Sequence, residues 1–268
     1  MRAEKRPARS GSALMPAEQT AGALPAVEAV DLSVGYGRET VLSKASFKLE
    51  AGQKLALVGA NGSGKTSLLR TIAGLLPPLG GSIRVLGGAP LSAPSRVAYL
   101  GQFNATATSL PMPAIDIVRM ARFSRHGLLG RLGPEDEEAV LGAMRGMGIL
   151  DLADMPLNRL SGGQRQRVYI AQALAREADL LLMDEPAAAL DAPSVATYRR
   201  LLEEAAGRGT AVIIATHDLE EARNCDRVLL LAKRVVGYGP AEELLRPEFL
   251  LETFGLENAD TAAHPEKV

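Results

Sequence analysis

The stretch GANGSGKTS, residues 59–67, decides the fold, because it follows an apolar, strand-like run and opens a helical pattern. It fits G-x-x-x-x-G-K-[ST], in which glycines let backbone N–H groups surround a phosphate at the start of a helix. Lys65 is then expected to reach the β- and γ-phosphates of a nucleotide, and the Thr66 hydroxyl to bind Mg²⁺. An ordinary glycine-rich turn is a poor alternative. The predicted nucleotide contacts are Gly59, Ala60, Asn61, Gly62, Ser63, Gly64, Lys65, Thr66 and Ser67.

A second signal is the run LLLMDEP, residues 180–186, in which two carboxylates end a continuous apolar strand pattern. An unpaired carboxylate at the end of a buried strand is costly, and a metal ion with its water shell offsets that cost. Asp184 is therefore the predicted Mg²⁺ partner. Glu185 follows it and is the predicted general base for the attacking water.

A third signal is RLSGGQRQRVYIAQALAREA, residues 159–178, a second helix start that contains paired glycines. Ser161 and Gln164 form an S-x-x-Q capping box, which is enough to explain a well-made helix start. It does not explain Gly162 and Gly163, because glycine weakens a helix. Close approach of an anion to the backbone explains both glycines, so these four residues are predicted to contact a phosphate.

Composition limits the classes of function. With 47% hydrophobic residues and a formal net charge of −1, the chain has no global basic field, and we expect no nucleic-acid partner. Its single cysteine, Cys225, cannot form an internal disulfide and is expected to be buried. The three histidines are scattered without metal-site spacing, and no apolar run reaches the length of a membrane helix.

The order of patterns predicts an α/β fold. Strand patterns run from Val27 to Gly59, a helix spans 65–76 before Pro77, and further strands reach Gln102. Residues 103–160 show helical patterns, with a helix start at Pro134. Helices and buried strands then alternate. The predicted organisation is a core of 26–101 and 166–255, a helical subdomain of 102–165, and flexible tails of 1–25 and 256–268.

Together these motifs resemble the ATP-binding subunits of ABC transporters, over nearly all of residues 27–255. The shared elements are the phosphate loop, LSGGQ at 160–164, the strand ending at Asp184-Glu185, ALD at 189–191 and THD around His217. The resemblance implies a P-loop NTPase of ABC type, with a mixed sheet, a RecA-like core, an antiparallel β subdomain and an inserted α-helical subdomain. One departure is PAAALD, where many relatives carry Ser or Thr before ALD.

The same resemblance implies roles that the residues alone do not assign. Tyr36 is expected to stack on adenine, and Gln102 to contact Mg²⁺ and the attacking water. His217 is expected to contact the γ-phosphate, although a strand-end histidine bonded to a neighbouring carboxylate is the simpler alternative. Asp191 is expected to bridge the two sites of a homodimer, in which Ser161 to Gln164 face the nucleotide of the other copy. An isolated monomer should then hydrolyse ATP poorly.

The region from residue 109 to 140 is similar to the branch of this family that imports manganese, zinc or iron. The similar positions are Pro111 or Pro113, Asp116, Val118, Met120, Arg122 and Phe123. This branch implies a separate membrane permease, an extracytoplasmic substrate-binding protein and a place at the cytoplasmic face of the membrane. Siderophore or haem as cargo, and a soluble ABC ATPase in translation or repair, are the alternatives. A P-loop kinase or GTPase is disfavoured because N-K-x-D is absent.

Overall fold

The computed structural model describes residues 24–102, 111–126 and 130–256, and within them the continuous apolar runs form a six-stranded sheet. The strand order is β5-β6-β7-β3-β8-β9, with β9 antiparallel to β8 and the other pairs parallel. Every residue of β3, β6 and β7 is buried, as expected for strands covered on both faces. The strands are β3 (Lys54–Val58), β5 (Val97–Leu100), β6 (Leu180–Asp184), β7 (Ala211–Thr216), β8 (Arg227–Leu231) and β9 (Val235–Pro240).

A second, antiparallel sheet has the order β2-β1-β4. Its strands are β1 (Val27–Tyr36), β2 (Glu39–Leu49) and β4 (Gly80–Val85). Buried and exposed residues alternate along much of β2, so one face of this sheet is covered and the other meets solvent. The mixed sheet and the antiparallel sheet together confirm the predicted fold class.

The side chains of the six-stranded sheet divide between two hydrophobic cores. Leu55 and Leu57 of β3 pack with α1 (Lys65–Ile72) and the antiparallel sheet. Ala56 and Val58 point to the other face, where they pack with residues of the helices. Because side chains alternate along a strand, the parallel sheet lies between two layers. One layer is α1 with the antiparallel sheet, and the other is formed by helices.

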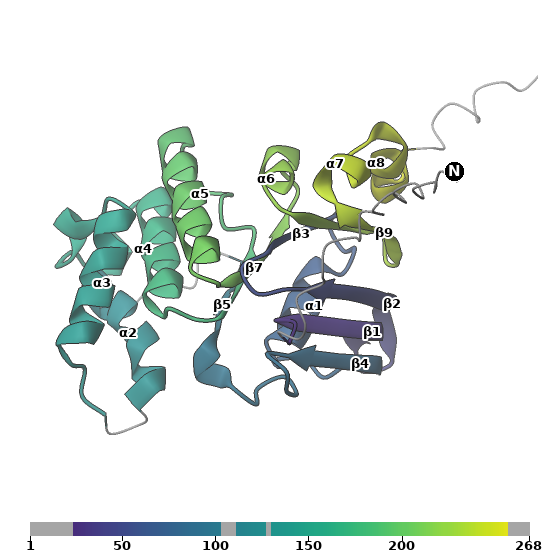
Figure 1. Cartoon of the computed structure of the whole chain (residues 1–268). Helices are drawn as coiled ribbons and strands as arrows, with labels where there is room; N and C mark the ends of the chain where they lie inside the picture. The colour runs from purple at the N-terminus through teal and green to yellow at the C-terminus, as the bar shows by residue number, and fades with distance from the viewer. Residues whose placement is uncertain (1–23, 103–110, 127–129, 257–268) are drawn as a thin grey trace, which may run out of the picture.

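The remaining helices pack in three groups (Figure 1): α4, α5 and α6 contact strands of the parallel sheet, α7 and α8 contact β8 and β9, and α2 and α3 contact α4. They are α2 (Ala114–His126), α3 (Pro134–Gly146), α4 (Gly162–Ala175), α5 (Ala192–Gly207), α6 (Leu219–Arg223), α7 (Ala241–Leu244) and α8 (Pro247–Phe254). Helix α3 begins at Pro134 as predicted. Helix α1 is shorter than the predicted 65–76, because Gly74 takes a left-handed φ of 76° and ends it before the prolines.

Helices α2 and α3 lie on one side of α4, away from the antiparallel sheet, as Figure 1 shows. A buried arginine, Arg122 of α2, joins them to the core: it pairs with Asp136 of α3 at 2.8 Å and donates to the Ala175 carbonyl at 2.9 Å. The subdomain boundaries stay a prediction. Most of both predicted tails, 1–23 and 257–268, lies outside the described residues.

The strand order brings the predicted site residues to one edge of the sheet. Strand β7 lies between β6 and β3, and Asp184 pairs in register with Ala215 while Val58 pairs with Thr216. The carboxyl ends of these parallel strands are therefore neighbours, and β5, which leads to Gln102, lies beside β6. Ligands of open α/β sheets bind outside this edge.

The structure also bears on the cysteine, on possible metal ligands and on possible membrane helices. Cys225 is buried, and burial raises the pKa of its thiol to about 12. Over the described ranges there is no group of three or more potential metal ligands among the His, Cys, Asp and Glu side chains. The helices found in those ranges are all too short or too polar to cross a membrane.

Candidate nucleotide-binding site

The loop between β3 and α1 depends on its glycines. Gly64 is the N-cap of α1 with φ of 107°, and a Cβ there would lie 2.9 Å from the Cβ of Leu42. At Gly59 a Cβ would lie 2.2 Å from the carbonyl oxygen of Leu231. No side chain of the described residues caps α1, so the first N–H groups of this helix are left for another acceptor. The loop therefore has the shape and the open donors of an anion site.

Lys65 lies within this loop and is almost fully buried. Its Nζ donates to the carbonyl oxygens of Gly59 at 2.7 Å and Ala60 at 3.1 Å. Burial lowers the pKa of Lys65, while the carboxylates of Glu185 and Asp184 act in the opposite direction. The ammonium is thus held beside the loop by weak carbonyl partners, which a phosphate can replace with stronger, charge-assisted bonds.

Asp184 ends β6 with only 2% of its surface exposed, and its Oδ2 has no hydrogen-bond partner among the described residues. Burial raises the pKa of this carboxyl, and the Thr66 hydroxyl opposes that shift. An orphaned carboxylate oxygen beside a hydroxyl is a costly arrangement unless a cation takes it up. Hard oxygen donors of this kind suit Mg²⁺, so Thr66 and Asp184 fit the predicted metal ion.

Glu185 lies between Gln102 and His217. Its Oε2 accepts from Gln102 Nε2 at 3.3 Å, and its Oε1 lies 3.7 Å from His217 Nδ1. Its φ is 51°, a left-handed conformation that costs a non-glycine residue about 1–3 kcal/mol and is concentrated at functional sites. The structure thus brings these three predicted catalytic residues together. His217 Nδ1 lies beyond hydrogen-bond distance of the carboxylate, and both interpretations of His217 stay predictions.

A hollow of about 340 Å³ collects the predicted phosphate contacts. It is lined by Val41, Asn61, Gly62, Gly64, Lys65, Thr66, Ser67, Gln102 and Glu185. The predicted contacts Gly59, Ala60, Ser63 and Asp184 do not line this hollow, and Ser63 Oγ is buried without a partner in the described structure. Elements far apart in the chain therefore form one polar site.

Tyr36 lies at the end of β1 and is 48% exposed. Its hydroxyl accepts from Ser67 at 3.5 Å and from Arg70 at 3.1 Å, and both contacts lower the pKa of Tyr36. The ring is thus fixed next to the first turns of α1 with much of its surface free. Adenine stacking by Tyr36 stays a prediction.

The start of α4 has the predicted capping box. Gln164 N donates to Ser161 Oγ at 3.2 Å, and Ser161 N donates to Gln164 Oε1 at 2.8 Å. A Cβ at Gly162 would meet nothing within 4 Å, so no local packing requires this glycine. At Gly163 a Cβ would lie 3.0 Å from the Ala189 carbonyl, so tight packing is a second reason for that glycine.

Asp191 is the N-cap of α5, where its Oδ1 accepts from Ser194 N at 3.0 Å. The contacts with Ser194 lower the pKa of Asp191. A capping role explains this aspartate within one chain, and its predicted role between two sites stays a prediction.

Gln166 of α4 is a residue that sequence analysis did not select. It is 1% exposed and donates to the carbonyl oxygen of Pro186, the residue after Glu185. In the sequence it is one polar residue of an amphipathic helix, and only the folded arrangement shows its partner.

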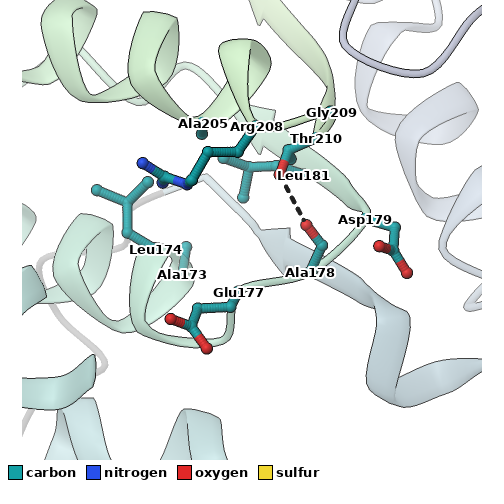
Figure 2. A pocket seen from close by; sticks show the side chains of 10 residues that line it. All are labelled: Ala173, Leu174, Glu177, Ala178, Asp179, Leu181, Ala205, Arg208, Gly209 and Thr210. Atoms are coloured by element: carbon teal, nitrogen blue, oxygen red, sulfur yellow. Dashed lines mark hydrogen bonds between the residues drawn. The ribbon is translucent and has the colours of Figure 1, made fainter. Parts of the chain in front are cut away.

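Another hollow, of about 290 Å³, lies at the opposite edge of the sheet. Figure 2 shows Asp179 and Thr210, which precede β6 and β7, together with Arg208 and Glu177 around it. Thr210 Oγ1 donates to the Ala178 carbonyl at 3.1 Å. This is the amino edge of the parallel strands, away from the phosphate loop, and none of the predicted site residues lines it.

Comparison with known proteins agrees with this geometry. The model of the ABC transporter family matches residues 42–188. The chain is 36% identical to the manganese transport system ATP-binding protein MntB of Bacillus subtilis over 85% of this chain and 92% of that protein. It is 35% identical to the zinc transport system ATP-binding protein TroB of Treponema pallidum, over 86% of this chain and 87% of that protein.

A solved structure of an ATP-binding subunit of an ABC transporter superposes with a TM-score of 0.72 at 26% identity. The superposition covers 87% of this chain and 95% of that one. The chain belongs to the ABC transporter family, as an ATP-binding subunit that hydrolyses ATP.

Proposed function

We propose that the loop at the start of α1 binds MgATP and that hydrolysis there powers import of a transition-metal ion through a separate permease. The observation that carries the nucleotide part is the buried Oδ2 of Asp184, which lies beside Thr66 and has no hydrogen-bond partner among the described residues. Thr66 and Asp184 would hold Mg²⁺, with Gln102 as the third predicted ligand. The ion would offset the negative charge of the phosphates.

The residues of this chain then have distinct tasks. The open N–H groups of α1 and the Lys65 ammonium bind and orient the phosphates. The Glu185 carboxylate accepts the proton of the attacking water, as a general base does. Its two oxygens face Gln102 and His217 at the rim of the site. Gln102 and His217 orient this carboxylate and contact the water and the γ-phosphate.

The start of α4 supports a site made from two chains. Its capping box leaves the N–H groups of Gly162 and Gly163 without a protein acceptor among the described residues. None of Ser161 to Gln164 lines the hollow at α1 of the same chain. We infer that two copies join head to tail, so that these groups of one copy bind the γ-phosphate held by the other, with Asp191 between the two sites.

The cargo is inferred from the relatives. Two of the proteins that match over most of both chains are named for manganese and for zinc transport. We therefore infer manganese, zinc or iron ions as the cargo, delivered by an extracytoplasmic binding protein to the permease. The ATPase would bind this permease at the cytoplasmic face of the membrane.

The nucleotide part is tested with Glu185→Gln, measured in the purified chain with MgATP. We expect kcat to fall about 10²–10⁴-fold, the contribution of a general base, while ATP affinity is kept. Glu138→Gln, at an exposed position of α3, is the control and should match the unchanged chain. Unchanged turnover in Glu185→Gln would remove Glu185 from the mechanism.

The cargo is tested in a strain of the source organism that lacks this gene. Cell-associated manganese, zinc and iron are measured after the gene is returned, unchanged or with Glu185→Gln. Restored accumulation of one of these metals only by the unchanged gene supports the proposal. Equal metal content in all strains, with loss of haem or siderophore uptake instead, would replace the metal ion by that cargo.

A further inference from the structure

Gln166 makes a buried contact between two segments of its own chain. One is the start of α4, which is proposed to face another copy, and the other is the segment that follows Glu185. Its Nε2 donates to Pro186 O at 2.7 Å, and Pro186 follows Glu185 directly. The side chain is 1% exposed, and its Oε1 has no partner in the described part of the chain. A buried amide that makes one short bond fixes the group it donates to, because losing the bond leaves a carbonyl unpaired.

A second contact joins the same two segments. A Cβ at Gly163 would lie 3.0 Å from Ala189 O, so the first turn of α4 packs directly on the loop of residues 186–190. Gln166 and Gly163 lie three residues apart and therefore on one face of α4. This face holds the loop at both of its ends.

The other side of the loop is hollow. A cavity of about 400 Å³ is lined by Glu185, Ala187, Ala188, Val195, Thr216, His217, Asp218 and Glu221. Packing from that side therefore does little to hold the loop. Glu185 itself has a φ of 51°, which persists only where surrounding contacts enforce it. One of these is the bond from Glu185 N to Ala215 O at 2.9 Å, and the contact from Gln166 comes one residue later.

We propose that Gln166 is a positioning residue for Glu185: it holds the loop of residues 186–190 on α4 so that the carboxylate stays between Gln102 and His217. The inference rests on the proposed role of Glu185 as general base. The same bond links the two ends of the proposed dimer mechanism within one chain. When the start of α4 shifts on binding the phosphate held by the other copy, Pro186 moves with it. The two sites of a dimer would thus be coupled through each chain.

The test compares two glutamines of the same helix. Gln166→Met keeps the length of the side chain and removes the donor. Gln172→Met does the same for Gln172 Nε2, which donates to Ile117 O of α2 at 2.9 Å, away from Glu185. We expect Gln166→Met to lower kcat about 10- to 100-fold, as misplacement of a catalytic group does, without a change in ATP affinity. Gln172→Met should keep the kcat of the unchanged chain.

A double-mutant cycle with Glu185→Gln separates positioning from general damage. If Gln166 acts through the Glu185 carboxylate, Gln166→Met should have no further effect on kcat once that carboxylate is gone. Additive losses in the cycle, or equal kcat values for Gln166→Met and Gln172→Met, would overturn the inference. If Gln166→Met does not fold, Gln166→Asn, whose amide is too short to reach Pro186, takes its place in both comparisons with the same expected results.

The failure of this inference is distinct from the failure of the proposed function. If Glu185→Gln alone leaves kcat unchanged, the role of Glu185 is wrong, and the positioning role of Gln166 is wrong with it. If Glu185→Gln abolishes turnover but Gln166→Met does not reduce it, only the role of Gln166 is lost.

Discussion

The starts of α1 and α4 look alike in sequence, since both contain glycines next to a serine, but they differ in how their N–H groups are satisfied. Helix α1 has Gly64 as its N-cap and no side-chain cap, whereas α4 has a complete capping box from Ser161 and Gln164. The first start has a buried lysine beside it and is the proposed phosphate site. The second is satisfied by its own side chains, apart from the N–H groups of Gly162 and Gly163, which have no acceptor among the described residues. The two starts therefore differ in the side-chain cap, which α4 has and α1 lacks.

The largest expected effect that tests this comparison comes from Gly162→Asp. The position has open space around it, and an acidic residue in the first turn suits the helix dipole, so the free energy of unfolding should be kept or slightly raised. In the active site, however, the carboxylate would repel the γ-phosphate and block an N–H donor. We expect kcat to fall about 10²–10³-fold, the usual cost of losing such a donor.

Measurement of ATP turnover and of urea unfolding on the same sample separates the two effects of Gly162→Asp. Full turnover with a stable fold would show that the α4 start does not meet a phosphate. Loss of both properties would point to a packing role for Gly162, which its open surroundings do not predict.

A third helix start sharpens the comparison, because α3 supplies its own anion. Gly133 N donates to Asp136 Oδ2 at 2.9 Å, and this bond, together with Arg122, lowers the pKa of Asp136 to about 2. The ordinary value is 3.8, so the shift corresponds to about 2 kcal/mol of stability. Because the pKa is depressed in the folded state, this stability is present above pH 4 and is lost as the pH falls through about 2.

Asp136→Asn should therefore lower the free energy of unfolding by at least about 2 kcal/mol at pH 7, since Arg122 also loses its buried partner. The difference from the unchanged chain should shrink as the pH is lowered from 4 to 2 in urea-unfolding measurements. Asp154→Asn, at an exposed position, serves as the control. A difference that stays constant with pH would argue against the depressed pKa.

The smallest effect is expected at the cap of α4 itself. Ser161→Ala removes the acceptor of Gln164 N and should lower the free energy of unfolding by about 1 kcal/mol. The helix start should remain formed, because Arg165 N still donates to Ser161 O at 2.9 Å. An unfolding free energy equal to that of the unchanged chain would mean that the capping box does not stabilise α4.

The sequence predicts the parts of this molecule that depend on short-range signals. The phosphate loop needs glycines at fixed spacing, buried parallel strands need continuous apolar runs, and the acidic pair ends one of them at Asp184. These features allowed the fold class to be predicted, and the family match supports it. Resemblance supplied the expected roles of Tyr36, Gln102, His217 and Asp191, of which the structure places Gln102 and His217 beside Glu185.

The features that were missed depend on contacts between distant segments. Gln166 and Pro186 are 20 residues apart in the chain, and no local pattern indicates that an amide of one meets the carbonyl of the other. The second reason for Gly163, its packing on Ala189, is likewise visible only in the fold. Pro77 and Pro78 predict the end of α1 at residue 76, but Gly74, with its left-handed φ of 76°, follows the last helical residues and ends the helix earlier.

The central claim is that each active site combines the α1 start of one copy with the α4 start of another. It is tested most directly by mixing two chains, Lys65→Ala and Gly162→Asp, each of which is expected to have little ATP turnover alone. Each chain keeps the half-site that the other has lost, so a mixed dimer contains one complete site. The account predicts that an equal mixture recovers about a quarter of the ATP turnover of the unchanged protein, as random pairing of two-fold dimers requires. Turnover of the mixture that stays at the level of the two separate variants would contradict it.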